Sequence, residues 1–228
     1  MKYGEIINAL KYSDLSSHGV FADELDVSDK EKLLYCTNQA LVDLYTKYPL
    51  LQKELVIIQK SWITNYVIDK KYAFTADPQD PNWYIMDSTF DPYLGDLIKI
   101  VDVSDESGDF YAMNSMNFCK VANTPAPNII QIPNPVDSNA LFVSYRAKHP
   151  TLVDEQSDIH LPANWLPSLY ALIAHKVYAG GTAPEHIAKS QEFLQKYELF
   201  CSQQRDYGMS NEDLFYSGCI NFNKGGWM

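Results

Sequence analysis

The chain lacks any long hydrophobic run. Apolar residues make up 46% of its 228 residues, but no stretch approaches the roughly 18 consecutive apolar residues that a membrane-spanning helix needs. The first residues, MKYGEIINALKYSD, carry acidic and polar side chains where a secretory signal has its apolar core. We therefore expect a globular protein that is made in the cytoplasm and does not enter a membrane.

Paired cysteine motifs are also missing. The four cysteines lie far apart, without a CxxC pair or a nearby set of histidines: Cys36, Cys119, Cys201 and Cys219. Disulfide frameworks and zinc sites usually show recognisable cysteine spacings. The spacing therefore favours free thiols in a reducing compartment.

Basic residues are scarce relative to acidic ones. The chain has 18 Lys and Arg residues against 29 Asp and Glu residues, a formal net charge of −11. Stable binding to DNA phosphates requires clustered Lys and Arg, so the balance argues against a nucleic-acid-binding protein. An acidic surface suits a wall past which DNA slides without sticking, although ordinary solubility explains the same charge.

Catalytic signatures are absent as well. The sequence has no G-x-S-x-G elbow, Walker loop or dinucleotide fingerprint. The turn VDVSDESGDFY is not a calcium loop, because Ser107 occupies the position of the required glycine and no glutamate closes the loop. Asp105, Glu106 and Gly108 instead predict a hairpin turn. We expect no enzymatic activity and no cofactor.

One group of side chains has the chemistry of a metal site. Its members are carboxylates and imidazoles, which are zinc ligands: His149, Asp154, Asp158, His160, His175 and His186. Helical geometry places His175 away from the main apolar stripe and His186 in a first helical turn, so we do not expect the ligands to converge. The alternative function is a small metal-dependent hydrolase or binding domain that uses the His149–His186 region and the aromatic loop around Trp83.

Hydrophobic periodicity predicts an α+β fold. A capping box at Ser28–Glu31, followed by apolar residues at helical spacing, predicts a helix that ends near Pro49; its stripe is Leu34, Leu41, Leu44, Tyr45 and Tyr48. A shorter helix is expected near residues 6–10.

From Leu55 onward, short β-branched runs predict strands at LVIIQ, NYVI, LIKIVDV, NIIQI and LFVSY. Residues 77–92 contain three Asp-Pro steps and predict a loop.

The last third of the chain predicts a helical hairpin interrupted at Gly180 and Gly181. The second helix should begin at a capping box of Thr182 and Glu185, with its stripe at Ile187, Leu194, Tyr197 and Cys201.

The first helix has a main stripe of Leu166, Leu169, Tyr170, Ile173 and Val177. Trp165 and Leu172 form a second stripe about a quarter turn away. Two apolar faces predict two packing partners. The second partner is either a neighbouring subunit, with Trp165 and Leu172 as the interface, or the rest of a monomer in which this helix is central.

The predicted organisation is a small antiparallel helical bundle with an inserted β-rich domain and an extended C-terminal arm. The expected boundaries are 1–52 for the N-terminal helices, 53–150 for the insertion, 151–206 for the helical hairpin and 207–228 for the arm. The arm has no helical or strand period but is rich in aromatics: Tyr207, Phe215, Tyr216, Phe222 and Trp227. Large rings fill pockets at low entropic cost, so we expect these residues to bind a partner. The alternative is that the arm folds back on its own domain.

The order of these parts resembles the head-to-tail adaptor (connector) proteins of short-tailed bacteriophages. The segment VSYRAKHPTLVDEQSDIHLPANWLPSLYALIAHKVYAGG carries the resemblance, with Tyr145, Pro150, Leu161 and Pro162 as recurring marks. The resemblance implies a helical bundle with a β-rich insertion and a structural role. The Asp-Pro-rich loop departs from the shorter hairpins that the resemblance leads us to expect.

The resemblance also implies partners and a location. Such a protein is made in the host cytoplasm and assembles as a ring of roughly twelve copies beneath the portal protein, in the neck of the virion. It helps to retain packaged DNA, which passes through without specific binding. It also presents a platform for tail components, namely a tail tube or nozzle protein and tail fibres.

Overall fold

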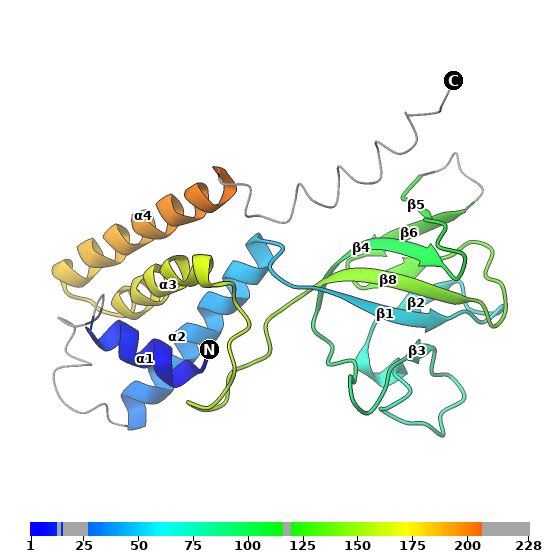
Figure 1. The fold of residues 1–228 in the computed structure, drawn as a ribbon, viewed down its shortest axis with the longest axis horizontal. Coiled ribbons are helices and arrows are strands. Elements are labelled where there is room, and N and C mark those ends of the chain that lie inside the picture. The colour runs from blue at the N-terminus through cyan, green and yellow to red at the C-terminus, as the bar shows by residue number, and fades with distance from the viewer. Residues whose placement is uncertain (13–14, 16–26, 116–119, 207–228) are drawn as a thin grey trace. The chain divides into compact units, whose positions relative to one another are not determined.

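The computed structural model describes residues 1–12, 15, 27–115 and 120–206 (Figure 1). The chain divides into two compact units. The helical unit combines residues 1–50 with the chain from residue 149 onward, and the β unit consists of residues 51–148. Both junctions lie two residues before the boundaries that the sequence suggested.

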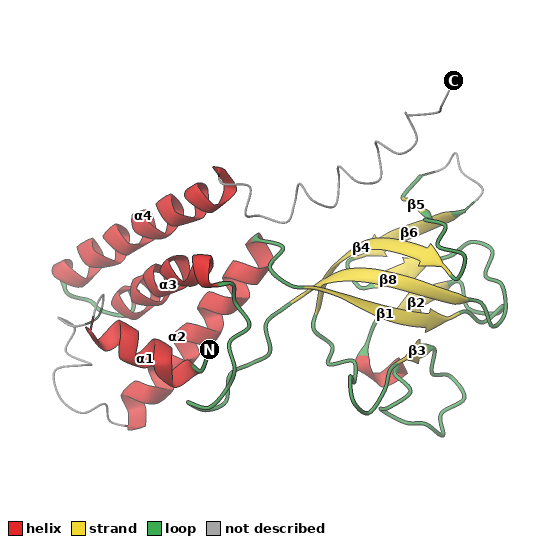
Figure 2. Cartoon of the chain, in the orientation of Figure 1, coloured by secondary structure: helices red, strands yellow, loops and turns green. Residues whose placement is uncertain are grey.

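The described residues confirm a mixed α+β fold, with four α-helices and two sheets of four strands each (Figure 2). The helices are α1 (Tyr3–Tyr12), α2 (Val27–Lys47), α3 (Leu166–Ala179) and α4 (Pro184–Asp206), with a short 3-10 helix η3 (Ala163–Trp165) before α3. None of the described helices is long and apolar enough to cross a membrane.

Helix α3 is the centre of the helical unit, since it contacts α1, α2 and α4. The buried stripe predicted for α2 is confirmed at Leu41, Leu44, Tyr45 and Tyr48. At its start Leu33 is fully buried and Leu34 is only partly buried, so the stripe begins one residue earlier than predicted. Two aromatic contacts join the helices: Tyr48 with Trp165, at 4.6 Å between ring centroids, and Tyr178 with Phe193, at 5.6 Å.

The predicted stripe of α4 is confirmed at Tyr197 and Cys201, which are buried, but not at Ile187, which is 51% exposed; Leu194 is partly buried. The other buried positions are Ser190 and Phe193. The stacking of Phe193 on Tyr178 sets this face. Both predicted capping boxes are also displaced. Ser28 is already the second residue of α2, and α4 begins at Pro184, a residue that suits the first turn because its missing N–H would be unpaired there.

The β unit contains strands β1 (Gln52–Ile58), β2 (Asn65–Val67), β3 (Ile85–Met86), β4 (Leu97–Asp105), β5 (Ala112–Met113), β6 (Val121–Ala126), β7 (Ile129–Gln131) and β8 (Ala140–Ala147). Their orders are β3-β1-β8-β4 in one sheet and β2-β7-β6-β5 in the other. Each predicted β-branched run falls on one of these strands. The short strands β3, β5 and β6 were not predicted, and β3 lies inside the stretch predicted as a loop.

The core of the β unit follows the two-residue alternation of strands. On β8, Leu141, Val143, Tyr145 and Ala147 are buried, and they pack in one cluster with side chains of both sheets. The predicted turn after β4 is confirmed: Gly108 has a φ of +80°, which favours glycine, and its N–H donates to the Asp105 carbonyl at 3.0 Å.

Candidate functional site

The two residues predicted as a subunit interface lie in the interior of the helical unit. Trp165 is 1% exposed and Leu172 is 4% exposed. Trp165, in η3, packs on Tyr48, directly after the end of α2, so both residues of the second stripe are covered within the chain itself. The interface role is therefore corrected: α3 is apolar on two faces because it is the central helix of its own bundle.

The residues predicted to bind a partner lie outside the described part of the chain: Tyr207, Phe215, Tyr216, Phe222 and Trp227. Two of the four cysteines, Cys119 and Cys219, also lie outside it. Cys36 and Cys201 are buried, free thiols.

Large apolar side chains are exposed on the two helices that flank α3. Tyr35 and Val42 lie seven residues apart on α2 and are 66% and 42% exposed; this spacing puts them on one face. On α4, Ile187 and Leu199 are 51% and 55% exposed. Sequence reasoning missed these surfaces because it assigned Ile187 to the core and gave α2 a single stripe.

The chain from residue 149 to residue 162, here called the strap, folds over the start of α1. Tyr3 N–H donates to the Ser157 carbonyl at 3.0 Å, and Gly4 N–H donates to the Glu155 carbonyl at 2.9 Å. These amides are in the first helical turn, where no intrahelical acceptor is available. The strap therefore supplies the acceptors that a capping side chain would otherwise provide.

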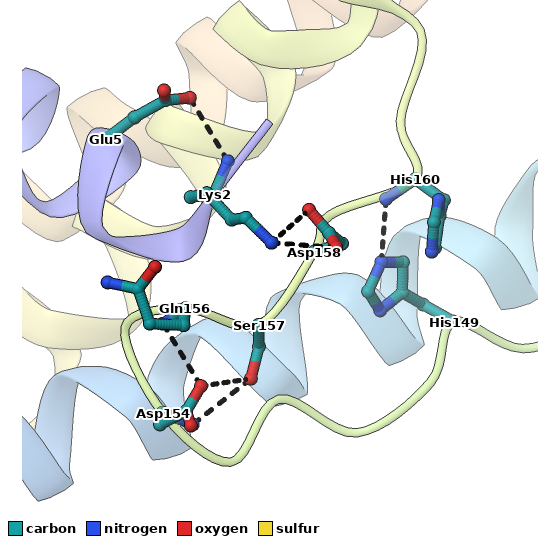
Figure 3. Close-up of polar contacts among 8 residues, drawn as sticks. All are labelled: Lys2, Glu5, His149, Asp154, Gln156, Ser157, Asp158 and His160. Carbon is teal, nitrogen blue, oxygen red and sulfur yellow. Dashed lines mark hydrogen bonds and ion pairs between the residues drawn. The ribbon is translucent and has the colours of Figure 1, made fainter.

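Charged side chains join the strap to the chain start and to α2. Lys2 Nζ lies 2.8 Å from the Asp158 carboxylate (Figure 3). Lys30 Nζ, on α2, lies 2.9 Å from the Glu155 carboxylate. The approach at Gly4 is close, because a Cβ there would lie 3.3 Å from the Glu155 carbonyl oxygen. Asp158 is thus engaged in an ion pair rather than directed at a shared ligand site.

Asp154 belongs to a turn within the strap. Its carboxylate accepts hydrogen bonds from the Gln156 N–H at 3.0 Å and from the Ser157 hydroxyl at 2.9 Å (Figure 3). Asp side chains commonly stabilise turns in this way, by bonding the backbone two residues on. The role of Asp154 is therefore structural.

His149 is the buried anchor at the start of the strap, with 3% of its surface exposed. Its Nε2 accepts the His160 N–H at 3.0 Å (Figure 3), and its Nδ1 lies 2.6 Å from the Pro150 carbonyl oxygen. These partners require a neutral ring with its proton on Nδ1. Burial lowers the pKa of His149, and Tyr45 of α2 covers the ring edge-on at 5.4 Å.

The histidines considered as metal ligands have separate roles. The rings of His149 and His160 are neighbours, at 5.9 Å between centroids. His175 Nδ1 lies 2.9 Å from the Ser190 carbonyl oxygen, and the His186 ring packs against Tyr178. In the described residues no group of three or more His, Cys, Asp or Glu side chains is placed to hold a metal ion.

Tyr145, one of the marks of the resemblance, anchors a buried polar cluster in the β unit. Its hydroxyl donates to the Asp96 carboxylate at 3.0 Å, and Lys53 Nζ lies 2.7 Å from the same carboxylate. Burial, followed by the nearby Asp96 charge, raises the pKa of Tyr145. The cluster ties the segment before β4 to strands β1 and β8.

No protein-family model matches the chain, and a search of curated proteins finds no match either. The functional argument therefore rests on the architecture of the two units and on their surfaces.

Proposed function

We propose that the protein is a head-to-tail adaptor, a structural virion protein that docks beneath the portal ring, helps to retain packaged DNA and provides the platform for tail assembly. The observation that carries the proposal is the split helical unit. Residues 1–50 and the chain after residue 149 form one bundle around α3, and the whole β unit is inserted between them. This is the architecture that the resemblance implies.

The exposed residues of the flanking helices support a ring. A ring needs a heterologous contact, in which one surface of a copy meets a different surface of the next. Tyr35 and Val42 provide one apolar surface on α2. On α4, Ile187 and Leu199 are twelve residues apart and lie on different sides of the helix, and Leu199 is the residue proposed for the second surface. Large exposed apolar residues on helix faces are typical of interaction sites.

The arm (residues 207–228) is the proposed anchor on the portal or on a neighbouring adaptor. Its aromatics fill pockets on those partners, and many weak arms around a ring add up through avidity. The remaining partners in this proposal are a tail tube or nozzle protein and tail fibres, and the assembly sits in the virion neck. The net charge of −11 suits a channel wall that DNA passes without specific binding.

The test is electron microscopy of the purified full-length chain, alone and mixed with the portal protein of the same phage. We expect a closed ring of roughly twelve copies seated on the portal. A monomer that never binds the portal and carries stoichiometric zinc or manganese would contradict the proposal and favour the metal-dependent alternative.

The helix surfaces can be tested in the same preparation. Tyr35→Glu and Leu199→Glu should each reduce ring formation, because a charge would be desolvated at the contact. Trp62→Glu is the matched control, since Trp62 is 70% exposed and belongs to the β unit rather than to either helix. Rings that form normally in both helix variants would show that other surfaces make the contact.

Deletion of residues 207–228 tests the arm. We expect the truncated chain to sediment poorly with DNA-filled, portal-bearing heads. Attachment at the full-length level would show that the arm is not the anchor.

A further inference from the structure

Strand β1 has an edge that is only half covered. On one side it pairs with β8 along its whole length, from Gln52↔Arg146 to Ile58↔Ala140. On the other side β3 pairs only with Val56 and Ile57. Among the described residues, the first half of β1 is therefore an open sheet edge.

The ladder fixes the direction of the backbone groups at this edge. The Leu51 carbonyl accepts the Ala147 N–H at 3.0 Å, so Leu51 faces β8. Ile58 faces the other way, because its N–H donates to the Tyr84 carbonyl at 2.8 Å. Hydrogen-bonding direction alternates along an antiparallel strand, so Gln52 and Glu54 share the direction of Ile58. Their N–H and C=O groups point to the open edge.

A groove of about 630 Å³ runs along this edge. The β1 edge at Glu54 forms one side, and the chain after β3, from Met86 to Tyr93, forms the other. Its lining combines charged residues with apolar ones, among which Met86 is 56% exposed. Open backbone donors beside a groove that can hold side chains are what an added peptide strand requires.

The far wall of the groove is held in place by Asp87. Its carboxylate accepts the Thr75 N–H at 2.8 Å and the Tyr93 N–H at 2.9 Å, and it also accepts the Thr75 hydroxyl. These bonds direct the chain away from β1 just where β3 would otherwise continue opposite Glu54. A preformed wall lowers the ordering cost of binding.

We propose that this groove binds residues 214–228 of a neighbouring copy, which add to the open edge of β1 as an extra strand. The inference rests on the proposed function, in which the arm is a docking element, and it names the receptor. In a ring each copy donates one arm and offers one groove, so the contacts close around the ring.

The charge and the length of the arm support residues 214–228 as the segment that binds the groove. The groove is lined by Lys53 and three carboxylates, those of Glu54, Asp87 and Asp91. The segment LFYSGCINFNKGGWM carries a single charged side chain, Lys224, of the opposite sign to the groove. Helix α4 ends at Asp206, and an extended chain from there to Phe222 spans up to roughly 50 Å.

The test uses the full-length chain with a photo-cross-linker in place of Phe222 (Phe222→p-benzoylphenylalanine). Equal amounts of isotope-labelled and unlabelled protein are mixed, irradiated and analysed by mass spectrometry. We expect cross-links from the arm to residues 52–56 or 86–93, with half of them joining a labelled to an unlabelled chain. Absence of cross-links, cross-links to other regions, or cross-links within single chains only would each overturn the proposal.

A matched pair of variants tests the added strand itself. Glu54→Pro removes the N–H that faces the groove while leaving the β1–β8 ladder intact, since proline is tolerated at edge positions. It should lower the cross-link yield about tenfold, whereas Glu54→Gln, which keeps the N–H and removes one of the three carboxylates, should lower the yield by no more than about twofold. Equal yields for the two variants would overturn the added strand. Met86→Lys, on the groove side, gives a second loss-of-binding variant in case Glu54→Pro folds poorly.

These outcomes are independent of the portal experiment because no portal is present. Loss of the cross-link with normal portal binding would leave the adaptor function standing and remove only the groove as receptor. A mapped cross-link in a chain that never binds a portal would retain the groove and contradict the adaptor function.

Discussion

The helical unit and the β unit protect their backbone polar groups in different ways. In the helical unit the strap brings carbonyl groups to the first amides of α1, and a central helix is covered by three others. In the β unit, β3 ends after two residues and leaves the edge of β1 open beside a groove. The difference teaches that the helical unit satisfies the backbone groups at the start of α1 from within its own chain, whereas the β unit leaves backbone groups of β1 open to another chain.

The largest loss of stability is expected when the core of the helical unit loses its largest buried side chain. Trp165→Ala should cost about 3–5 kcal/mol in the free energy of unfolding, because it leaves a cavity beneath Tyr48. Denaturant unfolding followed by circular dichroism would measure the loss. The control is Trp62→Ala, since Trp62 is 70% exposed and its replacement should change stability by less than about 0.5 kcal/mol. Equal effects of the two variants would contradict the assignment of Trp165 to the core.

The α3–α4 turn offers a sharper comparison between adjacent glycines. A Cβ at Gly181 would lie 2.0 Å from His186 Nδ1, whereas at Gly180 the nearest atom is at 3.6 Å. Gly181→Ala should therefore destabilise the helical unit by about 1–3 kcal/mol through overpacking. Gly180 has a helical φ of −76°, so Gly180→Ala should be neutral or slightly stabilising. A thermal unfolding series of both variants would decide, and a harmless Gly181→Ala would show that His186 moves freely.

His149, the buried residue at the start of the strap, should make the stability of the helical unit depend on pH. Burial holds the pKa of His149 below its ordinary value, so between the folded and unfolded pKa values the unfolded chain binds the extra proton. The free energy of unfolding should therefore fall as the pH drops below about 6.5, by up to roughly 1.4 kcal/mol per pH unit. His149→Phe should flatten this dependence in urea titrations at pH 7.5, 6.5 and 5.5. An unchanged slope in the variant would exclude His149 as the titrating group.

The smallest effect is expected at the outer ion pair of the strap. Lys2 and Asp158 are 45% and 53% exposed, and exposed pairs contribute little and are screened by salt. Lys2→Gln should therefore leave the unfolding midpoint nearly unchanged, and any loss should disappear at high ionic strength. A large, salt-independent loss would mean that the strap depends on this pair more than on its backbone hydrogen bonds.

Much of the fold could be predicted from local pattern, and the reasons for the exceptions are physical. The strands at LVIIQ and LFVSY were predictable because β-branched residues favour a pleated, half-buried surface. The first half of the buried face of α4 was not, because Phe193 and Ile187 are both apolar and only contact with Tyr178 selects Phe193. Trp165 was correctly identified as packed, but a sequence cannot tell whether the partner is the same chain or another. The groove depends on the turn that the hydrogen bonds of Asp87 hold in place. The hydrophobic periodicity of the sequence does not predict those bonds.

The inserted position of the β unit has a consequence for folding during synthesis. Helices α1 and α2 leave the ribosome long before α3, the helix on which they pack, has been made. The β unit lies between them, and its two ends meet, since the Leu51 carbonyl accepts the Ala147 N–H at 3.0 Å. Once that unit has folded, residues separated by nearly a hundred positions become neighbours, so the loop between α2 and α3 shrinks to residues 48–51 and 147–165 and its entropic cost falls. We therefore expect the β unit to fold first and the helical bundle to be completed last.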